Sequence, residues 1–349
     1  MINVLELTID QLKAAFAELG QPAFRATQVA DWVYRKGAVD AEAMTNLPPM
    51  LRSELTVCDS RVAARTDSTD GTVKLLLELA DTQRIECVMI PTDNRATACV
   101  STQVGCAMGC KFCASGQLGV TRNLTSGEIL QQVLHLAQVA GTRISHVVFM
   151  GMGEPLANYE ATLAAIRALN DPLRFNISAR NITVSTVGIP KAIRRLAGED
   201  LPITLSISLH APNDALRREL IPTAERYTID ELIAAAELLF KARGREITLE
   251  YLLLGGVNDT NVCAEALAQI AHRLRCSVNL IRYNPVPDLP YRRPATAVVQ
   301  AFAQRLTKRG VNVHTRRSRG LDADAACGQL RRRLEQQQIA EKEEEKQKE

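Results

Sequence analysis

Residues 97–113 read TACVSTQVGCAMGCKFC, in which a short apolar stretch typical of a β-strand runs into Cys106, Cys110 and Cys113. From this point on, strand-like and helix-like segments alternate along the chain. Because such alternation produces parallel sheets, six strand–helix units predict an α/β fold whose sheet curls into a full or partial (β/α)6 barrel. Chemistry in that architecture lies at the carboxyl ends of the strands. The later strand-like segments are rich in β-branched and apolar residues and cover 144–150, 181–186, 203–209, 246–254 and 277–283.

The sequence before the cysteine motif has a different character. Apolar residues recur at helical spacing up to about residue 57, and segments 72–79 and 84–90 resemble strands. Two helices of the barrel region are expected to begin at capping boxes, one formed by Thr125 and Glu128 and the other by Thr228 and Glu231. We therefore expect an N-terminal helical accessory domain with short β-strands (1–85), a barrel core (86–315), a C-terminal cysteine segment (316–333) and a charged tail (334–349).

Composition restricts the class of protein. Hydrophobic residues make up 46% of the 349 residues and charged residues 23%, which favours a globular chain with a sizeable core. The sequence contains no run of 18 apolar residues, and acidic residues occur too early for a signal peptide, so we expect a cytoplasmic protein without membrane association. An odd number of cysteines, nine, in such a chain favours metal ligation or catalysis over structural disulfides.

Charge is concentrated near the C-terminus. Residues 308–333 carry eight Lys and Arg against two Asp, a net charge of +6, and this basic stretch includes Cys327. Such a stretch is compatible with a polyanionic partner, although charge alone is weak evidence for one. Residues 334–349 carry three Lys and six Glu, a net charge of −3, and are typical of a solvated tail that is disordered or a frayed helix.

The three closely spaced cysteines indicate an iron–sulfur centre. Thiolates at Cys106, Cys110 and Cys113 can bind three irons of a four-iron cube, which leaves the fourth iron without a protein ligand. The alternative is a zinc site, which needs a fourth Cys or His at short spacing. The next His downstream is His135, so the zinc interpretation lacks its fourth ligand.

The motif resembles the signature of the radical-SAM superfamily. The resemblance implies that S-adenosylmethionine (SAM) chelates the open iron of a [4Fe–4S] cluster and is cleaved by one electron to a 5′-deoxyadenosyl radical. The segment GMGEP, residues 151–155, is similar to the superfamily's site for the SAM amino group. A carboxylate such as Glu154 can bind an ammonium group, and glycine lets the backbone approach a ligand closely.

Longer matches narrow the resemblance to the RlmN/Cfr family of RNA adenine methyltransferases. They extend over nearly the whole chain and include Cys99 and Cys327 in matching contexts. The matching segments are FRATQVADWVYRKG, MTNLPPMLR, CVSTQVGCAMGCKFCASG, VVFMGMGEPLANY, SISLHAPND, GVNDT, NLIRYNP and DAACGQL.

The resemblance implies a role for each of three further residues. The adenine carbon that this family methylates is electron-poor, so it cannot attack the SAM methyl group directly. Cys327 would be the methyl carrier, aided by basic neighbours such as Arg316, Arg317 and Arg319. Cys99 would attack the Cys327 sulfur and release the RNA as a Cys99–Cys327 disulfide forms. Glu86 would accept a proton from the adduct, the alternative being an ordinary carboxylate on the face of a strand.

Further residues are expected around SAM. By the resemblance, these contacts come from polar or small residues at the ends of apolar strands. The resemblance also implies that Met150 contacts the cavity on the substrate side. His210 could instead be a satisfied core histidine. The remaining cysteines, Cys58, Cys87, Cys263 and Cys276, are interpreted as buried small hydrophobes. The expected SAM contacts are Gly153, Glu154, Ser185, Ser208, Leu209, His210 and Asn284.

The resemblance also implies substrates and partners. Pro155 follows Glu154, as in RlmN-type sequences, which favours methylation at C2 over the C8 position of the Cfr branch. The implied substrates are adenosine 2503 of 23S rRNA and adenosine 37 of some tRNAs, gripped in part by the N-terminal domain. Reduced flavodoxin or ferredoxin is the expected electron donor, and a monomer the expected state. The remaining alternative, a non-catalytic iron–sulfur RNA-binding protein, would not need Cys99 and Cys327.

Overall fold

The structure is a computed structural model that describes residues 1–92, 95–117, 119–287, 289–316 and 318–329. The tail expected over 334–349 lies outside these residues, as do Arg317 and the last four residues of the segment expected over 316–333. Among the described residues, no helix is both long and apolar enough to span a lipid bilayer.

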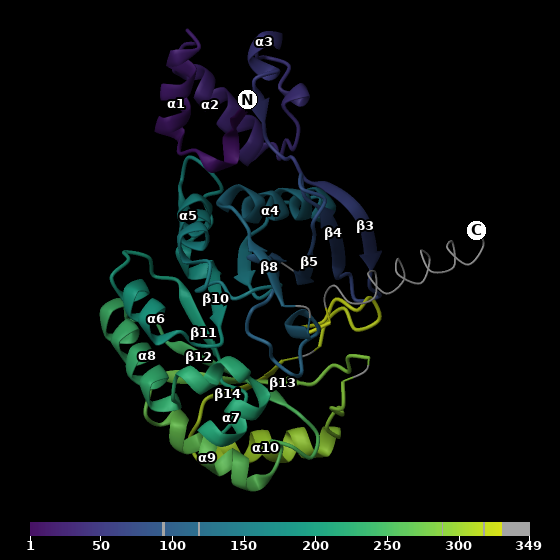
Figure 1. The fold of residues 1–349 in the computed structure, drawn as a ribbon, viewed down its shortest axis with the longest axis vertical. Coiled ribbons are helices and arrows are strands. Elements are labelled where there is room, and N and C mark those ends of the chain that lie inside the picture. The colour runs from purple at the N-terminus through teal and green to yellow at the C-terminus, as the bar shows by residue number, and fades with distance from the viewer. Residues whose placement is uncertain (93–94, 118, 288, 317, 330–349) are drawn as a thin grey trace, which may run out of the picture.

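The N-terminal region is helical, as the sequence predicts, and lies at one end of the molecule (Figure 1). Its first helix begins at a capping box of Thr8 and Gln11, and two short strands pair in parallel beside it. The elements are β1 (Ile2–Asn3), η1 (Val4–Glu6), α1 (Ile9–Glu18), α2 (Phe24–Ala30), the π-helix η2 (Asp31–Arg35), η3 (Ala41–Ala43), α3 (Pro49–Arg52) and β2 (Leu55–Thr56).

One ten-stranded sheet, in the order β14-β13-β12-β11-β10-β9-β6-β5-β4-β3, organises the rest of the described chain. The strands from β6 to β14 run parallel, whereas β3 to β6 form antiparallel pairs. The strands are β3 (Arg61–Asp67), β4 (Val73–Glu78), β5 (Arg84–Thr92), β6 (Arg95–Cys99), β9 (His146–Phe149), β10 (Ile182–Thr186), β11 (Thr204–Ser208), β12 (Ile247–Leu253), β13 (Cys276–Arg282) and β14 (Val313–Arg316).

The predicted partial barrel is confirmed. Within the described residues, six strand–helix units follow one another from β6 to α10, and both predicted capping boxes are present, at the starts of α4 and α8. The sheet continues through β3–β5 without a break at residue 85, so the domain division at that point stays a prediction. The helices are α4 (Ser126–Ala140), α5 (Tyr159–Asn170), α6 (Pro190–Ala197), α7 (Asp214–Leu220), α8 (Ile229–Arg243), α9 (Asn261–Ala271) and α10 (Thr296–Lys308), with 3-10 turns η4 (Ala114–Gln117), η5 (Ala179–Asn181) and η6 (Pro222–Arg226).

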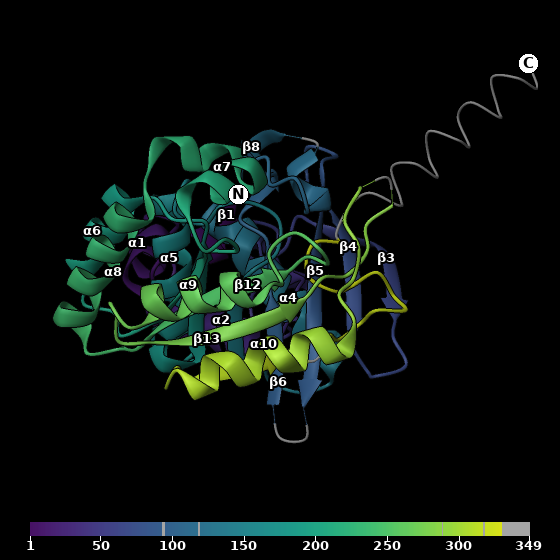
Figure 2. The same ribbon diagram turned by 90° about the horizontal axis from the view of Figure 1, so that it is seen from below.

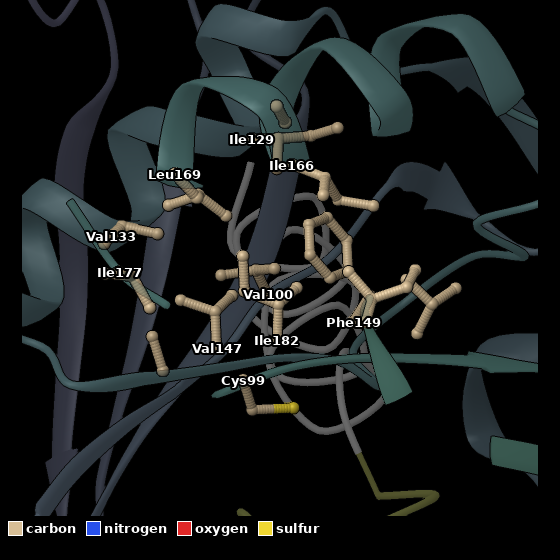
Figure 3. Packing of buried hydrophobic residues seen from close by; sticks show 14 of the residues in the cluster. Cys99, Val100, Ile129, Val133, Val147, Phe149, Ile166, Leu169, Ile177 and Ile182 are labelled. Carbon is tan, nitrogen blue, oxygen red and sulfur yellow. The ribbon is translucent and has the colours of Figure 1, made fainter. Parts of the chain in front are cut away.

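Side chains alternate in direction along each strand, so one set packs against the helices and the other faces the interior of the barrel. Val147 and Phe149 of β9 face the surrounding helices and pack among buried aliphatic side chains. Cys99 ends the neighbouring strand β6, and its sulfur points to the opposite side of the sheet (Figure 3). Helices α8, α9 and α10 cover the outside of the later strands (Figure 2). The helix-facing side is therefore filled by packing, and the other side is left for chemistry.

Candidate active site

The three motif cysteines line one cavity at the mouth of the barrel. Their loop leaves the short strand β7 (Gln103–Gly105) and returns to β8 (Val120–Asn123), and the Cys106 amide donates to the Gly119 carbonyl at 2.8 Å. The loop closes tightly, because a Cβ on Gly116 would lie 2.8 Å from the Cys110 nitrogen. The sequence motif therefore becomes a compact turn with three thiols on one wall.

The donor set fits an iron–sulfur cluster. Burial raises the pKa of all three thiols, that of Cys106 to about 12, and the neighbouring thiols add to the effect. A positively charged iron–sulfur core would reverse this penalty and favour the thiolates. In the part of the chain that the structure describes, no three His, Cys, Asp or Glu side chains converge on a single-ion site. Thiols spread along a cavity wall suit a multi-iron cluster better than a tetrahedral zinc ion.

The segment after β9 brings a buried carboxylate to the same cavity. Gly153 lines the cavity with φ of 101°, and a Cβ there would lie 2.8 Å from the Gln103 backbone nitrogen. Glu154 accepts hydrogen bonds from the Leu156 and Val187 amides at 3.0 and 2.8 Å. Burial nevertheless raises the pKa of Glu154 above its usual range. An ammonium group entering the cavity would stabilise this carboxylate, which suits an amino-group site.

Most of the other residues expected to contact SAM also line the cavity. Ser185 and Ser208 end neighbouring strands, and their hydroxyl oxygens are 3.4 Å apart. The His210 ring accepts a hydrogen bond at Nδ1 from the Leu252 amide, and burial lowers the pKa of this histidine to about 3, so the ring is neutral. Asn284 lines an adjoining cavity with Cys327 and accepts from Arg293 and Ser318. Leu209 is fully buried beside them.

Cys99 and Cys327 lie within electrostatic range of each other, near the inner side of the sheet. Both are free thiols, so the expected disulfide is not formed in the structure. Burial and, to a lesser extent, Cys327 raise the pKa of Cys99, whereas Arg316 lowers it, and the resulting pKa is about 12. The Arg316 guanidinium lies 3.8 Å from the Glu250 carboxylate and donates to the Met150 sulfur at 3.7 Å. Arg316 and Cys327 thus line the cavity of the three motif cysteines, and the charge of Arg316 acts on both Cys99 and Cys327.

Glu86 lies on the same interior face as Cys99, because it is two residues from Val88 along β5. Val88 is paired with Cys99 of β6 and with Lys74 of β4, so all four side chains lie on one side of the sheet. The buried Lys74 ammonium is 3.2 Å from the Glu86 carboxylate and also donates to the Asp324 carbonyl at 3.2 Å. The Glu86 side chain is therefore in an ionic contact and connected to the Cys327 segment through Lys74.

The segment that carries Cys327 is docked at both ends. Asp322 accepts hydrogen bonds from Ser68 and from the Thr69 amide, which lie in the β3–β4 turn, and these bonds lower its pKa to about 2. On the other side, the Ala114 amide of the cysteine loop donates to the Gly328 carbonyl at 2.8 Å. Cys327 itself is exposed at the cavity mouth.

Comparison with known proteins identifies the family. The chain is 50% identical over 324 residues to a protein of Thermosynechococcus vestitus named "Probable dual-specificity RNA methyltransferase RlmN", a match that covers 92% of this chain and 96% of the relative. The chain belongs to the RlmN family. A Rhodopirellula baltica protein of the same name is 47% identical, and the match covers 95% of this chain and 91% of the relative.

Other comparisons agree with this membership. Residues 100–265 match the Radical SAM superfamily, and residues 2–59 match the ribosomal RNA large subunit methyltransferase N-terminal domain. A solved structure of a radical SAM methyltransferase from Sphaerobacter thermophilus has a TM-score of 0.92 at 45% identity, over 95% of this chain and 99% of that one. The chain is thus a radical-SAM RNA methyltransferase, and the predicted family and enzyme class are confirmed.

Sequence reasoning missed several charged residues of the site. Glu250, Lys74 and Arg217 are each buried, although the residue types favour the surface. A signal was present for two of them, because Glu250 and Lys74 interrupt otherwise apolar strands. The interpretation of the spare cysteines as buried was correct for Cys87 alone. Cys58, Cys263 and Cys276 are only half-buried.

Proposed function

We propose that this enzyme methylates C2 of adenosine 2503 in 23S rRNA and C2 of adenosine 37 in some tRNAs. The observation that supports the proposal most is the cavity that Cys327 and Arg316 line together with the three motif cysteines, with Cys99 within electrostatic range of both. The relatives' name, dual-specificity RNA methyltransferase, supports two RNA substrates. Reduced flavodoxin or ferredoxin would donate electrons, and the enzyme would act as a monomer in the cytoplasm.

The proposed ligand assignments follow from the donor chemistry. Cys106, Cys110 and Cys113 would hold a [4Fe–4S] cluster, and Glu154 would bind the amino group of SAM. Ser185, Ser208, Leu209, His210 and Asn284 would surround the rest of SAM at the barrel mouth, with Gly153 leaving room for it. When bound, SAM would supply the methyl group. The cluster would supply one electron to start the radical chemistry and would take one electron back at its end.

Cys327 would act as the methyl carrier. Its thiolate would attack the SAM methyl carbon, forming a sulfur–carbon bond while the carbon–sulfonium bond breaks. Arg316 would favour the thiolate, because its guanidinium lies within electrostatic reach of Cys327. One hydrogen atom would be removed from the carrier's methyl group by the radical chemistry that bound SAM supplies, and the remaining carbon would bond to C2 of the adenine as a carbon–nitrogen π bond at C2 opens. RNA and protein would then be joined through the Cys327 sulfur, and the adduct would have one electron and the C2 proton to lose.

Glu86 and Cys99 would then resolve the adduct. Glu86 would accept the C2 proton, and its carboxylate lies 3.2 Å from the Lys74 ammonium. The Cys99 thiolate would attack the Cys327 sulfur and form a disulfide. The electron pair of the broken carbon–sulfur bond would stay with the methylene carbon, which takes up a proton and becomes the new methyl group.

Variants of the two cysteines test these roles. Replacing Cys99 with Ala should leave the carrier working but remove the thiolate that breaks the tether, so protein covalently bound to RNA should accumulate. A denaturing gel of RNA-bound enzyme would show a retarded band in Cys99→Ala that disappears in the Cys99→Ala/Cys327→Ala double variant. Equal crosslinking in the double variant would show that Cys327 is not the carrier.

The position of methylation is tested separately. Nucleosides from RNA of cells with and without the gene are compared by mass spectrometry. Gene-dependent 2-methyladenosine in both 23S rRNA and tRNA is expected. Gene-dependent 8-methyladenosine without the 2-methyl isomer would instead place the enzyme's activity with the Cfr branch, and modification of rRNA alone would contradict the dual specificity.

A further inference from the structure

Arg217 of α7 is a buried guanidinium with few partners. Only 1% of the side chain is exposed, and it is among the largest fully buried side chains. Its Nη2 donates to the Val187 carbonyl, whereas its Nε has no hydrogen-bond partner. The Asp214 carboxylate influences Arg217 through its charge but accepts a hydrogen bond from the Ile229 amide.

Such an arrangement is unfavourable for an isolated protein. A charge removed from water costs several kcal/mol unless a counter-charge and further hydrogen bonds replace the lost hydration. Within the described residues Arg217 forms no salt bridge, and one carbonyl oxygen does not neutralise a guanidinium. Burial accordingly lowers the pKa of Arg217. The structure therefore contains a buried cation that needs an anion.

The surroundings show where that anion belongs. The segment containing α7 and η6 packs directly on the cysteine loop: the Lys111 amide donates to the Leu220 carbonyl at 3.0 Å, and Thr223 contacts the Met108 sulfur at 3.6 Å. Arg217 and Met108 line the same small cavity behind this loop. The charge of Arg217 also acts on the Cys110 thiol and on His210.

We propose that Arg217 is the counter-charge of the [4Fe–4S] cluster and raises its reduction potential. The inference rests on the proposed ligation by Cys106, Cys110 and Cys113. Three thiolates outweigh the dipositive core of an oxidised cluster, so the ligated unit is an anion, and reduction adds a second negative charge. A neighbouring cation stabilises the reduced unit more than the oxidised one, which makes the cluster easier to reduce. Arg217 is thus a positioning and tuning residue that need not touch SAM.

Three variants distinguish the effect of the Arg217 charge from the effect of the shape of its side chain. Arg217→Gln removes the charge but keeps a donor that can reach toward Val187, and Arg217→Lys keeps the charge. Arg218→Gln is the matched control, because Arg218 is the next residue of the same helix but is exposed, and its guanidinium donates to the Asp214 carbonyl of its own helix. Each reconstituted protein is assayed for iron and then titrated in the absence of SAM, with the reduced cluster followed by electron paramagnetic resonance.

At a fixed potential, we expect the ratio of reduced to oxidised cluster to be about tenfold lower in Arg217→Gln than in the wild type. For a one-electron reduction this corresponds to a midpoint potential lower by about 59 mV. Arg217→Lys should recover most of the potential, and Arg218→Gln should match the wild type. Iron uptake by the Lys variant but not by the Gln variant would also support a requirement for charge. A Gln variant with full iron and an unchanged midpoint, with or without weaker SAM binding, would overturn the inference, as would loss of iron from both Arg217 variants. If the wild type itself bound no cluster, the proposed function would fail instead.

A second measurement uses the cluster-free protein. Because Arg217 lacks an anion there, Arg217→Gln should melt at the same temperature as the wild type or higher. A melting temperature several degrees lower would show that Arg217 serves chiefly to anchor Val187, which contradicts the proposed role.

Discussion

The pKa of a single residue in this site depends on burial as much as on neighbouring charges. In the proposed release step Cys99 reacts as a thiolate, yet its burial at the end of β6 raises its pKa, to about 12. Arg316 works against this burial penalty. The site therefore places a poorly ionised thiol beside a cation, and the release step should respond to both pH and the charge of residue 316.

The first prediction concerns the pH dependence of RNA release. With a pKa near 12, the thiolate fraction of Cys99 rises about tenfold for each pH unit between 7 and 9. The decay of a preformed protein–RNA adduct, followed on denaturing gels, should accelerate by about that factor per unit until another step becomes limiting. Residual decay in Cys99→Ala should not follow this slope. Wild-type decay that is independent of pH would show that Cys99 ionisation does not control release.

The second prediction concerns Arg316. Arg316→Gln removes the cation that lowers the pKa of Cys99, and a rise of one pKa unit makes the thiolate about tenfold scarcer. Adduct decay at pH 8 should therefore slow by about three- to tenfold, and Arg316→Lys should restore much of the rate. Identical rates in the Gln and Lys variants would mean that Arg316 acts through its shape or through the Glu250 contact, not through its charge.

The third prediction concerns the backbone at Gly153. Its φ of 101° disfavours any side chain, and a Cβ would collide with Gln103. Gly153→Ala should lower the free energy of unfolding by about 1–3 kcal/mol, measured by urea denaturation, and weaken SAM binding. Gly141→Ala is the control, because Gly141 has φ of 60° and a Cβ added there would meet no atom within 4 Å. An equal loss in both variants would mean that the Gln103 contact adds nothing.

At the scale of elements, the β3–β4 turn positions the Cys327 segment. Asp322 bonds to Ser68 and Thr69, and the Gly320 amide donates to Asp70 at 3.1 Å. Lys74, next along β4, connects the same segment to Glu86. A hairpin that extends the barrel sheet thus holds the proposed methyl carrier near the proposed proton acceptor.

The fourth prediction concerns this docking. Asp322→Ala removes the acceptor for Ser68 and Thr69, so the segment should detach more often and trypsin should cleave after Arg319 several-fold faster. Asp67→Ala is a control on the same hairpin, because the Asp67 carboxylate accepts from Arg65 of its own strand and not from any described residue of the Cys327 segment. Unchanged cleavage in Asp322→Ala would indicate that the contact between Ala114 and Gly328 is sufficient to hold the segment.

At the scale of the whole molecule, a buried arginine joins the N-terminal helices to the barrel. Arg174 follows α5 and donates to the Tyr34 hydroxyl at 3.0 Å and to the Leu5 carbonyl at 2.7 Å. The Tyr34 ring meets Phe175 edge to face at 4.9 Å. These contacts fix the helical region against the barrel, which would keep a surface for folded RNA in a constant position relative to the cavity.

The fifth prediction tests this connection. Arg174→Met leaves the Leu5 carbonyl and the Tyr34 hydroxyl without their donor, and each unsatisfied buried group costs about 1–3 kcal/mol. The free energy of unfolding should therefore fall by about 2–6 kcal/mol in urea denaturation. Tyr34→Phe, which removes one partner only, should cost about 1 kcal/mol. If hydrogen exchange showed a loss of protection in the N-terminal helices alone, the two regions would unfold separately.

Local sequence determined the order and type of the elements. Apolar strands between amphipathic helices predicted the parallel barrel, and Thr125 and Thr228 marked where two helices begin, because capping depends on residues three positions apart. Strands β3 and β14 were not predicted, since both have polar, largely exposed sequences without the apolar pattern of an inner strand. The spacing of Cys106, Cys110 and Cys113 likewise needed no tertiary information, because one short loop contains all three.

Only the tertiary structure decided which distant residues meet. Cys99 and Cys327 lie within electrostatic range of each other because β6 and the segment after β14 are brought to the same interior, and that depends on sheet order and curvature, which no local pattern encodes. The same holds for the contact of Lys74 with Glu86 and for the position of Arg217 behind the cysteine loop. A lone charged residue in a sequence is ordinarily solvated, and only the packing around it shows that it is buried and requires a partner.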